Sequence, residues 1–226
     1  MKDYSKEHIF EAKKEIVRAQ VARFHEFYSD YFNRENTIPM VRYFFEQIYN
    51  LEGKEEWQEL AISTFDKVKH MIKDQTRINI QQLLDLNNLT DKLDTQLAYL
   101  LVEKGWNGQQ QQLNLEEYTQ LYKELGHEIE RKEQLVIVLK NLRQFYELAH
   151  RPINAMIMRP ARFMSKILGV YPLFARVEEG YHAVLPVNHE IFEAFYQEVK
   201  KKEWEFLYNA FPKIKDEERN NLLSNE

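Results

Sequence analysis

The sequence predicts an all-α protein, and three of its features lead to this prediction. The 226 residues include only six glycines and six prolines, fewer turn-forming residues than an all-β fold needs. Hydrophobic residues make up 44% of the chain, which is enough for a substantial core. Through most of the sequence, apolar residues recur three and four positions apart, the spacing of one helical face. We therefore expect a single-domain multi-helix bundle of eight or nine helices over residues 1–211, followed by a polar C-terminal tail over residues 212–226.

The most regular apolar pattern marks residues 39–50, which we expect to form a central helix. Its apolar side chains fall on one wide face: Val41, Phe44, Phe45, Ile48 and Tyr49. The backbone N–H groups in the first turn of a helix have no partner within the helix. Pro39, which has no N–H, therefore suits that turn. We expect other helices to contact most of this segment. Similar patterns predict helices over residues 6–33, 54–73 and 77–104.

Capping residues and prolines divide the second half of the chain. Asn114 and Glu117 form a capping-box pattern, which predicts a short helix that ends at a glycine. A long helix is expected over residues 127–150. Prolines and a glycine interrupt residues 152–183, so we expect two or three short helices there instead of one rod. Asn188 is expected to cap the last helix.

Composition and charge exclude several classes of protein. Because the chain has no cysteine, it has no disulfide, thiolate nucleophile, zinc finger or iron–sulfur cluster. A net charge of −5 and a pI near 5.9 argue against general nucleic-acid binding. No apolar stretch approaches the length of a transmembrane helix, and the N-terminus lacks the apolar core of a signal peptide. We therefore expect a cytoplasmic protein of bacterial type that binds no nucleic acid.

Residues 42–49 resemble the signature of the bacterial FFLEELY motif proteins. The segment departs from that motif at Tyr43, Phe45 and Gln47, where the motif has Phe, Leu and Glu. These changes keep the apolar face and remove one carboxylate. Three further stretches are similar to the same family: residues 89–94, 151–162 and 173–181. The resemblance extends over nearly the whole chain; it implies a single helical domain and indicates no catalytic residue.

The first candidate site is a basic segment, residues 148–177, in a chain that is acidic overall. It contains five basic residues and no Asp or Glu: Arg151, Arg159, Arg162, Lys166 and Arg176. Met, aliphatic and aromatic residues lie between them. Such a segment can bind an acidic protein, a phosphorylated ligand or an anionic lipid surface, so peripheral membrane contact is one expectation. Alternatively, its arginines pair inside the fold with acidic residues elsewhere: Glu46, Asp91, Asp94, Glu178 and Glu179.

The second candidate site is a polar network among the helices. Its members lie in the motif stretches, on helices whose other faces are strongly apolar: Arg42, Glu46, Tyr49, Asp94, Arg159 and Glu179. If these groups converge on a central pocket, they form a ligand site. If they only pair with one another, they form a structural network that fixes the register of the helices.

The third candidate is a di-metal carboxylate site. Ferritin-like centres use a Glu-x-x-His pair twice, because residues three apart on a helix point the same way. The chain contains two such pairs and two further glutamates near aromatic faces: Glu147 with His150, Glu179 with His182, and Glu26 with Glu46. That chemistry would be oxygen activation at two irons. The alternative is that these histidines are surface residues or partners of helix ends.

From the sequence we therefore favour a non-enzymatic binding module for an acidic partner or an anionic or amphipathic ligand, with no cofactor. The expected ligand-binding residues are Arg42, Glu46, Tyr49, Asp94, Arg151, Arg159, Arg162 and Glu179. The main alternative is a ferritin-like di-metal oxidase that uses Glu147, His150, Glu179 and His182. A third hypothesis is a scaffold whose charged residues only specify packing. The aromatic helix faces would also permit a homodimer.

Overall fold

The computed structural model describes residues 4–47, 49, 51, 54–70, 74–108 and 112–214. It is all-α, as predicted: the residues that it describes are 83% helical and form no strand. Of the helical segments in this part of the chain, nine have at least seven residues. Most of the predicted polar tail, residues 215–226, lies outside the described residues.

Contacts along the chain divide it into two compact units. Unit 1 comprises Met1–Tyr28, Asn87–Val138 and Gln197–Glu226, and unit 2 comprises Ser29–Leu86 and Leu139–Tyr196. Three long helices contribute residues to both units: α5 (Asp74–Glu103), α7 (Glu128–Ala149) and α10 (His189–Ala210). The expectation of a single domain over residues 1–211 stays a prediction.

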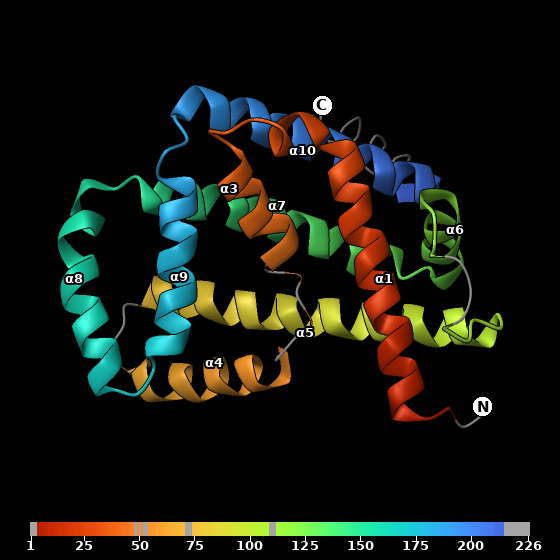
Figure 1. The fold of residues 1–226 in the computed structure, drawn as a ribbon, viewed down its shortest axis with the longest axis horizontal. Helices are drawn as coiled ribbons and strands as arrows, with labels where there is room; N and C mark the ends of the chain where they lie inside the picture. The colour runs from red at the N-terminus through yellow and green to blue at the C-terminus, as the bar shows by residue number, and fades with distance from the viewer. Residues whose placement is uncertain are drawn as a thin grey trace, which may run out of the picture. The chain divides into compact units, whose positions relative to one another are not determined.

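Unit 1 is built around α1 (Lys6–Phe27) and α6 (Leu115–Leu125), which pack against each other (Figure 1). Both begin with the caps that their sequences favour. The side chain of Ser5 accepts a hydrogen bond from the His8 N–H, and Asn114 and Glu117 form a reciprocal capping box. The core of this unit is apolar and aromatic: Ile16, Leu97, Leu101, Tyr118, Leu207 and Phe211 are among its buried members.

The first helix is shorter than predicted. The sequence favoured one helix over residues 6–33, whereas α1 ends at Phe27 and a separate short helix, α2 (Ser29–Phe32), follows. At Tyr28 the backbone leaves the helical conformation, with φ −119° and ψ 26°. The Tyr28 side chain is fully buried, and its hydroxyl donates to Glu203 Oε1 across 2.6 Å. The helix therefore ends where Tyr28 contacts a residue that is distant in the sequence.

Unit 2 contains α3 (Ile38–Arg42), η1 (Tyr43–Gln47), α4 (Lys54–Val68), α8 (Pro152–Ile167) and α9 (Tyr171–Val184). Helix α9 packs against α3, α4 and α8, and α8 and α9 form an antiparallel pair (Figure 1). The described core residues of the unit include Met40, Val41, Phe45, Tyr146, Phe192 and Phe195. The rings of Tyr146 and Phe192 stack with centroids 3.7 Å apart.

The predicted central helix changes its geometry midway. Residues 38–42 are α-helical, and Tyr43–Gln47 form one turn of wider π-helix. A π-turn inserts an extra residue into the helical repeat, so it rotates the side chains that follow. Val41 and Phe45 are buried as expected, while Phe44 is half-buried. Ile48 and Asn50 lie outside the described residues.

The helices expected in residues 77–104 and 152–183 are present. Helix α5 continues without a break, so Asn87 and Asn88 do not interrupt it. Two helices, α8 and α9, share the second segment, and Gly169 between them takes a positive φ of 70°. Pro160 lies inside α8 instead of ending it. Its side chain is exposed, and on a solvent-facing side water can satisfy the carbonyl that loses its N–H partner.

Candidate functional site

Helix α8 turns several large apolar side chains outward. The exposed fraction is 76% for Met156, 66% for Phe163 and 62% for Ile167. These positions are seven and four residues apart, so they form one stripe along the helix. On the opposite side of the helix, Ser165 is only 4% exposed. The apolar face that an amphipathic helix normally buries is therefore the face that α8 exposes.

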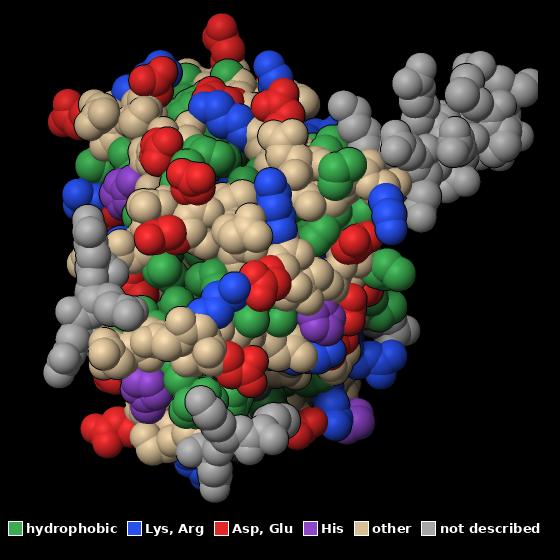
Figure 2. Space-filling model, turned by 90° about the vertical axis from the view of Figure 1, so that its right-hand side faces the viewer, with side chains coloured by type: hydrophobic (Ala, Val, Ile, Leu, Met, Phe, Trp, Pro, Cys, Tyr) green, Lys and Arg blue, Asp and Glu red, His purple; other side chains and the backbone are tan. Residues whose placement is uncertain are grey.

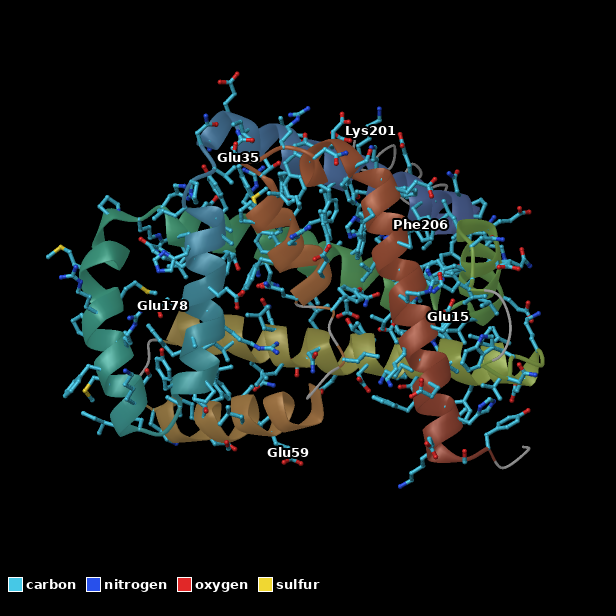
Figure 3. The ribbon with its side chains drawn as sticks, viewed as in Figure 1. Glu15, Glu35, Glu59, Glu178, Lys201 and Phe206 are labelled. Atoms are coloured by element: carbon cyan, nitrogen blue, oxygen red, sulfur yellow. The ribbon has the colours of Figure 1, made fainter. Side chains whose placement is uncertain are left out.

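Helix α8 is held to α9 by polar contacts. Arg162 Nη2 lies 2.6 Å from Glu178 Oε2, and Arg162 Nε donates to both carboxylate oxygens, at 3.0 and 3.1 Å. The Glu178 side chain is 12% exposed, and Figure 3 places it between α8 and α9. Its hydrogen bond raises the pKa of Arg162. Nearby, the Val170 N–H donates to the Ser165 carbonyl oxygen at 2.8 Å.

The exposed apolar surface continues at the C-terminal end of α8. The exposed fraction is 48% for Met164 and 44% for Leu168, which follows the helix directly. Thus the exposed apolar surface of α8 extends from Met156 to the end of the helix.

Basic side chains flank this apolar stripe on one side. Arg159, Arg162 and Lys166 are exposed and follow the helix at intervals of three and four residues. Lys166 Nζ lies 4.9 Å above the ring of Tyr171, and Arg159 forms no ion pair with another described residue. No Asp or Glu occurs in residues 148–177. By contrast, the face of the molecule in Figure 2 carries acidic and basic side chains interspersed.

The two remaining basic residues of the segment differ in exposure. Arg151 is the N-cap residue of α8 and is exposed. Arg176, on α9, is half-buried, and its charge partly opposes the rise in the pKa of Tyr43 that burial and Glu179 cause. The prediction that the arginines pair inside the fold is therefore met by Arg162 with Glu178, and the pair joins neighbouring helices of unit 2.

Three members of the polar network expected around the central helix have exposed side chains. Arg42, Arg159 and Glu179 are exposed, and the Arg42 and Glu46 side chains approach only to 4.0 Å. Glu179 instead accepts a hydrogen bond from Gln47 Nε2 at 2.8 Å. The long side chains start beside the apolar face, but their charged heads reach water along the edges of their helices.

The other two members of that set behave differently. Tyr49 is half-buried. Asp94 is 6% exposed and belongs to unit 1, whereas the rest of the set belongs to unit 2. Among the eight residues that we expected to bind a ligand, Arg159 and Arg162 lie on α8 beside its exposed apolar stripe, and Arg151 is the N-cap residue of the same helix.

The structure gives no support to the di-metal hypothesis. In the part of the chain that is described, no three His, Asp or Glu side chains come together to hold a metal ion. His150 Nδ1 lies 3.0 Å from the Tyr146 carbonyl oxygen. The centroids of the His150 and Tyr146 rings are 4.1 Å apart. His150 is therefore a partner of the helix end, which is the alternative that the sequence offered.

The sequence analysis did not predict two contacts that the structure contains. In unit 1, Arg23 and Glu203 form a buried ion pair. In unit 2, the Tyr43 ring packs directly on the backbone of Gly180. Arg23 lies four residues after Ala19 and seven after Ile16, both buried, so its place on the apolar face of α1 is a signal that the sequence contains.

None of the helices in the described part of the chain combines the length and the apolar composition that a bilayer crossing requires. Residues 2–216 match a protein family described as a domain of unknown function, DUF8198. The comparison with curated proteins and the comparison with solved structures each found no match.

Proposed function

The chain belongs to the DUF8198 family, and on that premise we propose that it is a non-enzymatic binding protein whose α8 engages an anionic, amphipathic ligand. The observation that supports this function is the orientation of α8, with Met156, Phe163 and Ile167 outward beside a row of cations. We propose in addition that the chain is related to the FFLEELY motif proteins, as its sequence motifs suggest.

The exposed apolar stripe favours a ligand that contains hydrocarbon. Three large apolar side chains, each more than 60% exposed along one line of a helix, leave apolar surface in water. Covering such a surface releases about 25 cal/mol per Å² of apolar area. This free energy is gained only if the ligand has an apolar part that reaches along the helix.

The charges favour a ligand whose polar part is anionic. Arg159 and Lys166 flank the stripe, and the segment of residues 148–177 contains no acidic residue that would repel an anion. Arg162 contributes less, because Glu178 already pairs with it. A molecule with an anionic head and a hydrocarbon tail matches both features at once.

The proposal can be tested by NMR of the protein labelled with ¹³C at its methionine methyl groups, with dodecyl phosphate as the probe. We expect the methyl signals of Met156 and Met164 to shift at concentrations below the micelle threshold. Met40 is 0% exposed, so its signal is the internal control and should not move. Inorganic phosphate and the neutral dodecyl maltoside test the head and the tail separately, and each should cause smaller shifts.

The double variant Arg159→Gln with Lys166→Gln should weaken the response to dodecyl phosphate. Both side chains are exposed, so these changes should leave folding intact. The proposal would be wrong if dodecyl phosphate left both α8 methionines unchanged. It would also be wrong if the neutral amphiphile gave shifts as large as the anionic one.

A further inference from the structure

We infer that the partner of α8 is the surface of an anionic lipid bilayer, in which the helix lies parallel to the membrane plane. The inference rests on the proposed function and names the source of the anionic, amphipathic ligand. Helices that bind in this way have an apolar face that enters the boundary between head groups and acyl chains. Their lysine and arginine side chains remain at the level of the head groups.

The side chains of α8 are distributed in this manner. At 100° per residue, Met156, Phe163 and Ile167 fall within about 40° of one another around the helix axis. Arg159 and Lys166 lie next to that stripe, on one edge, where long side chains can reach lipid phosphates while the stripe enters hydrocarbon. Ser165, on the far side, is buried within the protein. One face of the helix is therefore free for the bilayer while the other is held by the fold.

The contacts of α8 with α9 hold α8 on the protein in this orientation. The ion pair of Arg162 with Glu178 fixes the polar side of α8 against α9. The Glu178 carboxylate is only 12% exposed, whereas the Arg162 side chain is 49% exposed, so the arginine reaches the surface while its partner lies beneath it. The apolar stripe is thus presented without any rearrangement of the helix pair.

A second copy of the chain fits this surface less well than a bilayer does. In a symmetric pair, the same patch meets itself, so Arg159 and Lys166 of one copy would approach the same cations of the other. No acidic residue in residues 148–177 is present to compensate for this repulsion. An acidic protein is the other candidate partner. It would offset the charges, but the apolar stripe would also require an apolar surface beside the acids.

The bilayer is favoured over a protein partner by the composition of the stripe. Protein interfaces are usually centred on Tyr, Trp and Arg anchors that enter pockets, whereas this stripe consists of Met, Phe and Ile on a convex helix. Flexible Met and aliphatic side chains adapt to fluid hydrocarbon at little entropic cost. A single amphipathic helix also predicts reversible binding, since the chain has no described helix that crosses a membrane.

The test is co-sedimentation of the full chain with vesicles. We expect binding to mixed phosphatidylglycerol and phosphatidylcholine vesicles, little binding to pure phosphatidylcholine, and weaker binding as salt is raised above about 0.1 M. Phe163→Ser with Ile167→Ser should weaken binding by about tenfold or more, because both anchors are lost. Arg159→Gln with Lys166→Gln should weaken it by about 25-fold, at roughly fivefold per cation.

Matched controls lie elsewhere on the chain. Ile129→Ser removes an apolar side chain that is 79% exposed on α7, and Lys201→Gln removes an exposed cation on α10 (Figure 3). Neither should change vesicle binding by more than about twofold. All substituted side chains are exposed, so thermal unfolding should be unchanged and will verify that each variant is folded.

The outcomes separate the two proposals. Loss of binding in both α8 variants, with normal binding in both controls, supports the bilayer surface. If the chain binds no anionic vesicle but dodecyl phosphate still shifts Met156, the bilayer inference is overturned and the proposed function stands. If poly-L-glutamate binds where vesicles do not, the partner is an acidic protein instead. Equal binding to anionic and neutral vesicles, or a loss caused by Ile129→Ser, would also overturn the inference.

Discussion

Arg23 and Glu203, 180 residues apart in the sequence, form a buried ion pair in unit 1, with Arg23 Nη2 2.8 Å from Glu203 Oε2. Their side chains are 1% and 14% exposed. Tyr28 donates to the other carboxylate oxygen at 2.6 Å, and the Arg23 guanidinium lies 4.3 Å above the ring of Phe206. Burial alone would lower the pKa of Arg23, but the adjacent Glu203 carboxylate raises it, so the arginine stays charged.

Removing the carboxylate should therefore be costly. Glu203→Gln leaves a charged guanidinium buried without a counterion, and we expect the free energy of unfolding to fall by about 3–5 kcal/mol. Replacing both partners by apolar residues, Arg23→Met with Glu203→Leu, should cost less than the single change, because no unpaired charge remains. Urea denaturation measures both changes.

An exposed pair in the same unit is the control for this prediction. Lys14 and Glu11 lie 2.7 Å apart on α1, with side chains that are 48% and 51% exposed. Glu11→Gln should cost less than about 1 kcal/mol. If Glu203→Gln were as mild as Glu11→Gln, the buried pair would not have the structural role that we assign to it.

Stability at high pH should depend on Tyr43. Burial, with the nearby Glu179 charge, raises the pKa of Tyr43 to about 12 from its ordinary value of 10.0. Because the folded protein holds this proton more tightly, the stabilisation is complete below pH 10 and is lost as the pH rises towards 12. Between these values the free energy of unfolding should fall by about 1.4 kcal/mol per pH unit.

The variant Tyr43→Phe has no hydroxyl proton to lose at this position. Comparing it with the unchanged protein therefore separates the titration of Tyr43 from that of the other tyrosines. Unfolding of both proteins at pH 9 and pH 11 should show a stability difference that shifts in favour of the variant at the higher pH. A difference that is the same at both pH values would show that the Tyr43 hydroxyl is not desolvated in the folded protein.

Gly180→Ala should destabilise the protein, although alanine is the better helix former. A Cβ atom at Gly180 would lie 2.2 Å from Cζ of Tyr43, and the Tyr43 ring is itself packed against Phe44 and Phe145. Because the ring has little space to move, we expect a loss of about 1–3 kcal/mol.

A double-mutant cycle tests the stated cause. In a Tyr43→Ala background the obstruction is gone, so Gly180→Ala should be neutral or stabilising by up to about 1 kcal/mol. If Gly180→Ala cost the same in both backgrounds, the Tyr43 contact would not be the reason that this position is a glycine.

The capping box of α6 offers a local test of how the sequence sets a helix boundary. Asn114 accepts from the Glu117 N–H and donates its own N–H to the Glu117 carboxylate, both at 2.9 Å. Asn114→Ala should cost about 1 kcal/mol. Gln120→Ala, at an exposed position of the same helix, should cost less than about 0.5 kcal/mol. Equal effects in urea denaturation would argue against the cap.

The features that were predictable from the sequence depend on local chemistry. The boundary of α6 follows from Asn114 and Glu117, which lie within one turn of each other, and the start of α10 follows from Asn188, whose side chain accepts from the Ile191 N–H. Apolar periodicity predicted the all-α class because a helix repeats every 3.6 residues whatever its neighbours are.

The features that were missed depend on contacts between distant segments. The π-helical turn begins at Tyr43, whose ring packs on Gly180, and the end of α1 coincides with the contact of Tyr28 with Glu203. Periodicity also overstated the core: Leu83, within the apolar pattern of residues 77–104, is 47% exposed, and Val138, within the helix expected over residues 127–150, is 40% exposed. A pattern in one helix does not specify which neighbours cover it.

Helix α8 illustrates the same limit at the candidate site. The sequence identified Arg151, Arg159 and Arg162 within a basic, Met-rich segment, and this segment is where the structure has its exposed apolar stripe. The sequence did not specify which face of α8 would turn towards the protein. That orientation follows from the packing of α8 on α9, including the pair of Arg162 with Glu178.

The measurement that tests the central claim most directly is the depth of spin labels on α8 in anionic vesicles. Because the chain has no cysteine, single substitutions such as Phe163→Cys, Ile167→Cys and Ile129→Cys give clean sites for a nitroxide. We predict that labels at residues 163 and 167 are accessible to oxygen in the bilayer and shielded from aqueous nickel, while the label at residue 129 remains in water. Labels on α8 that stay as accessible to nickel as the one at residue 129 would contradict the account.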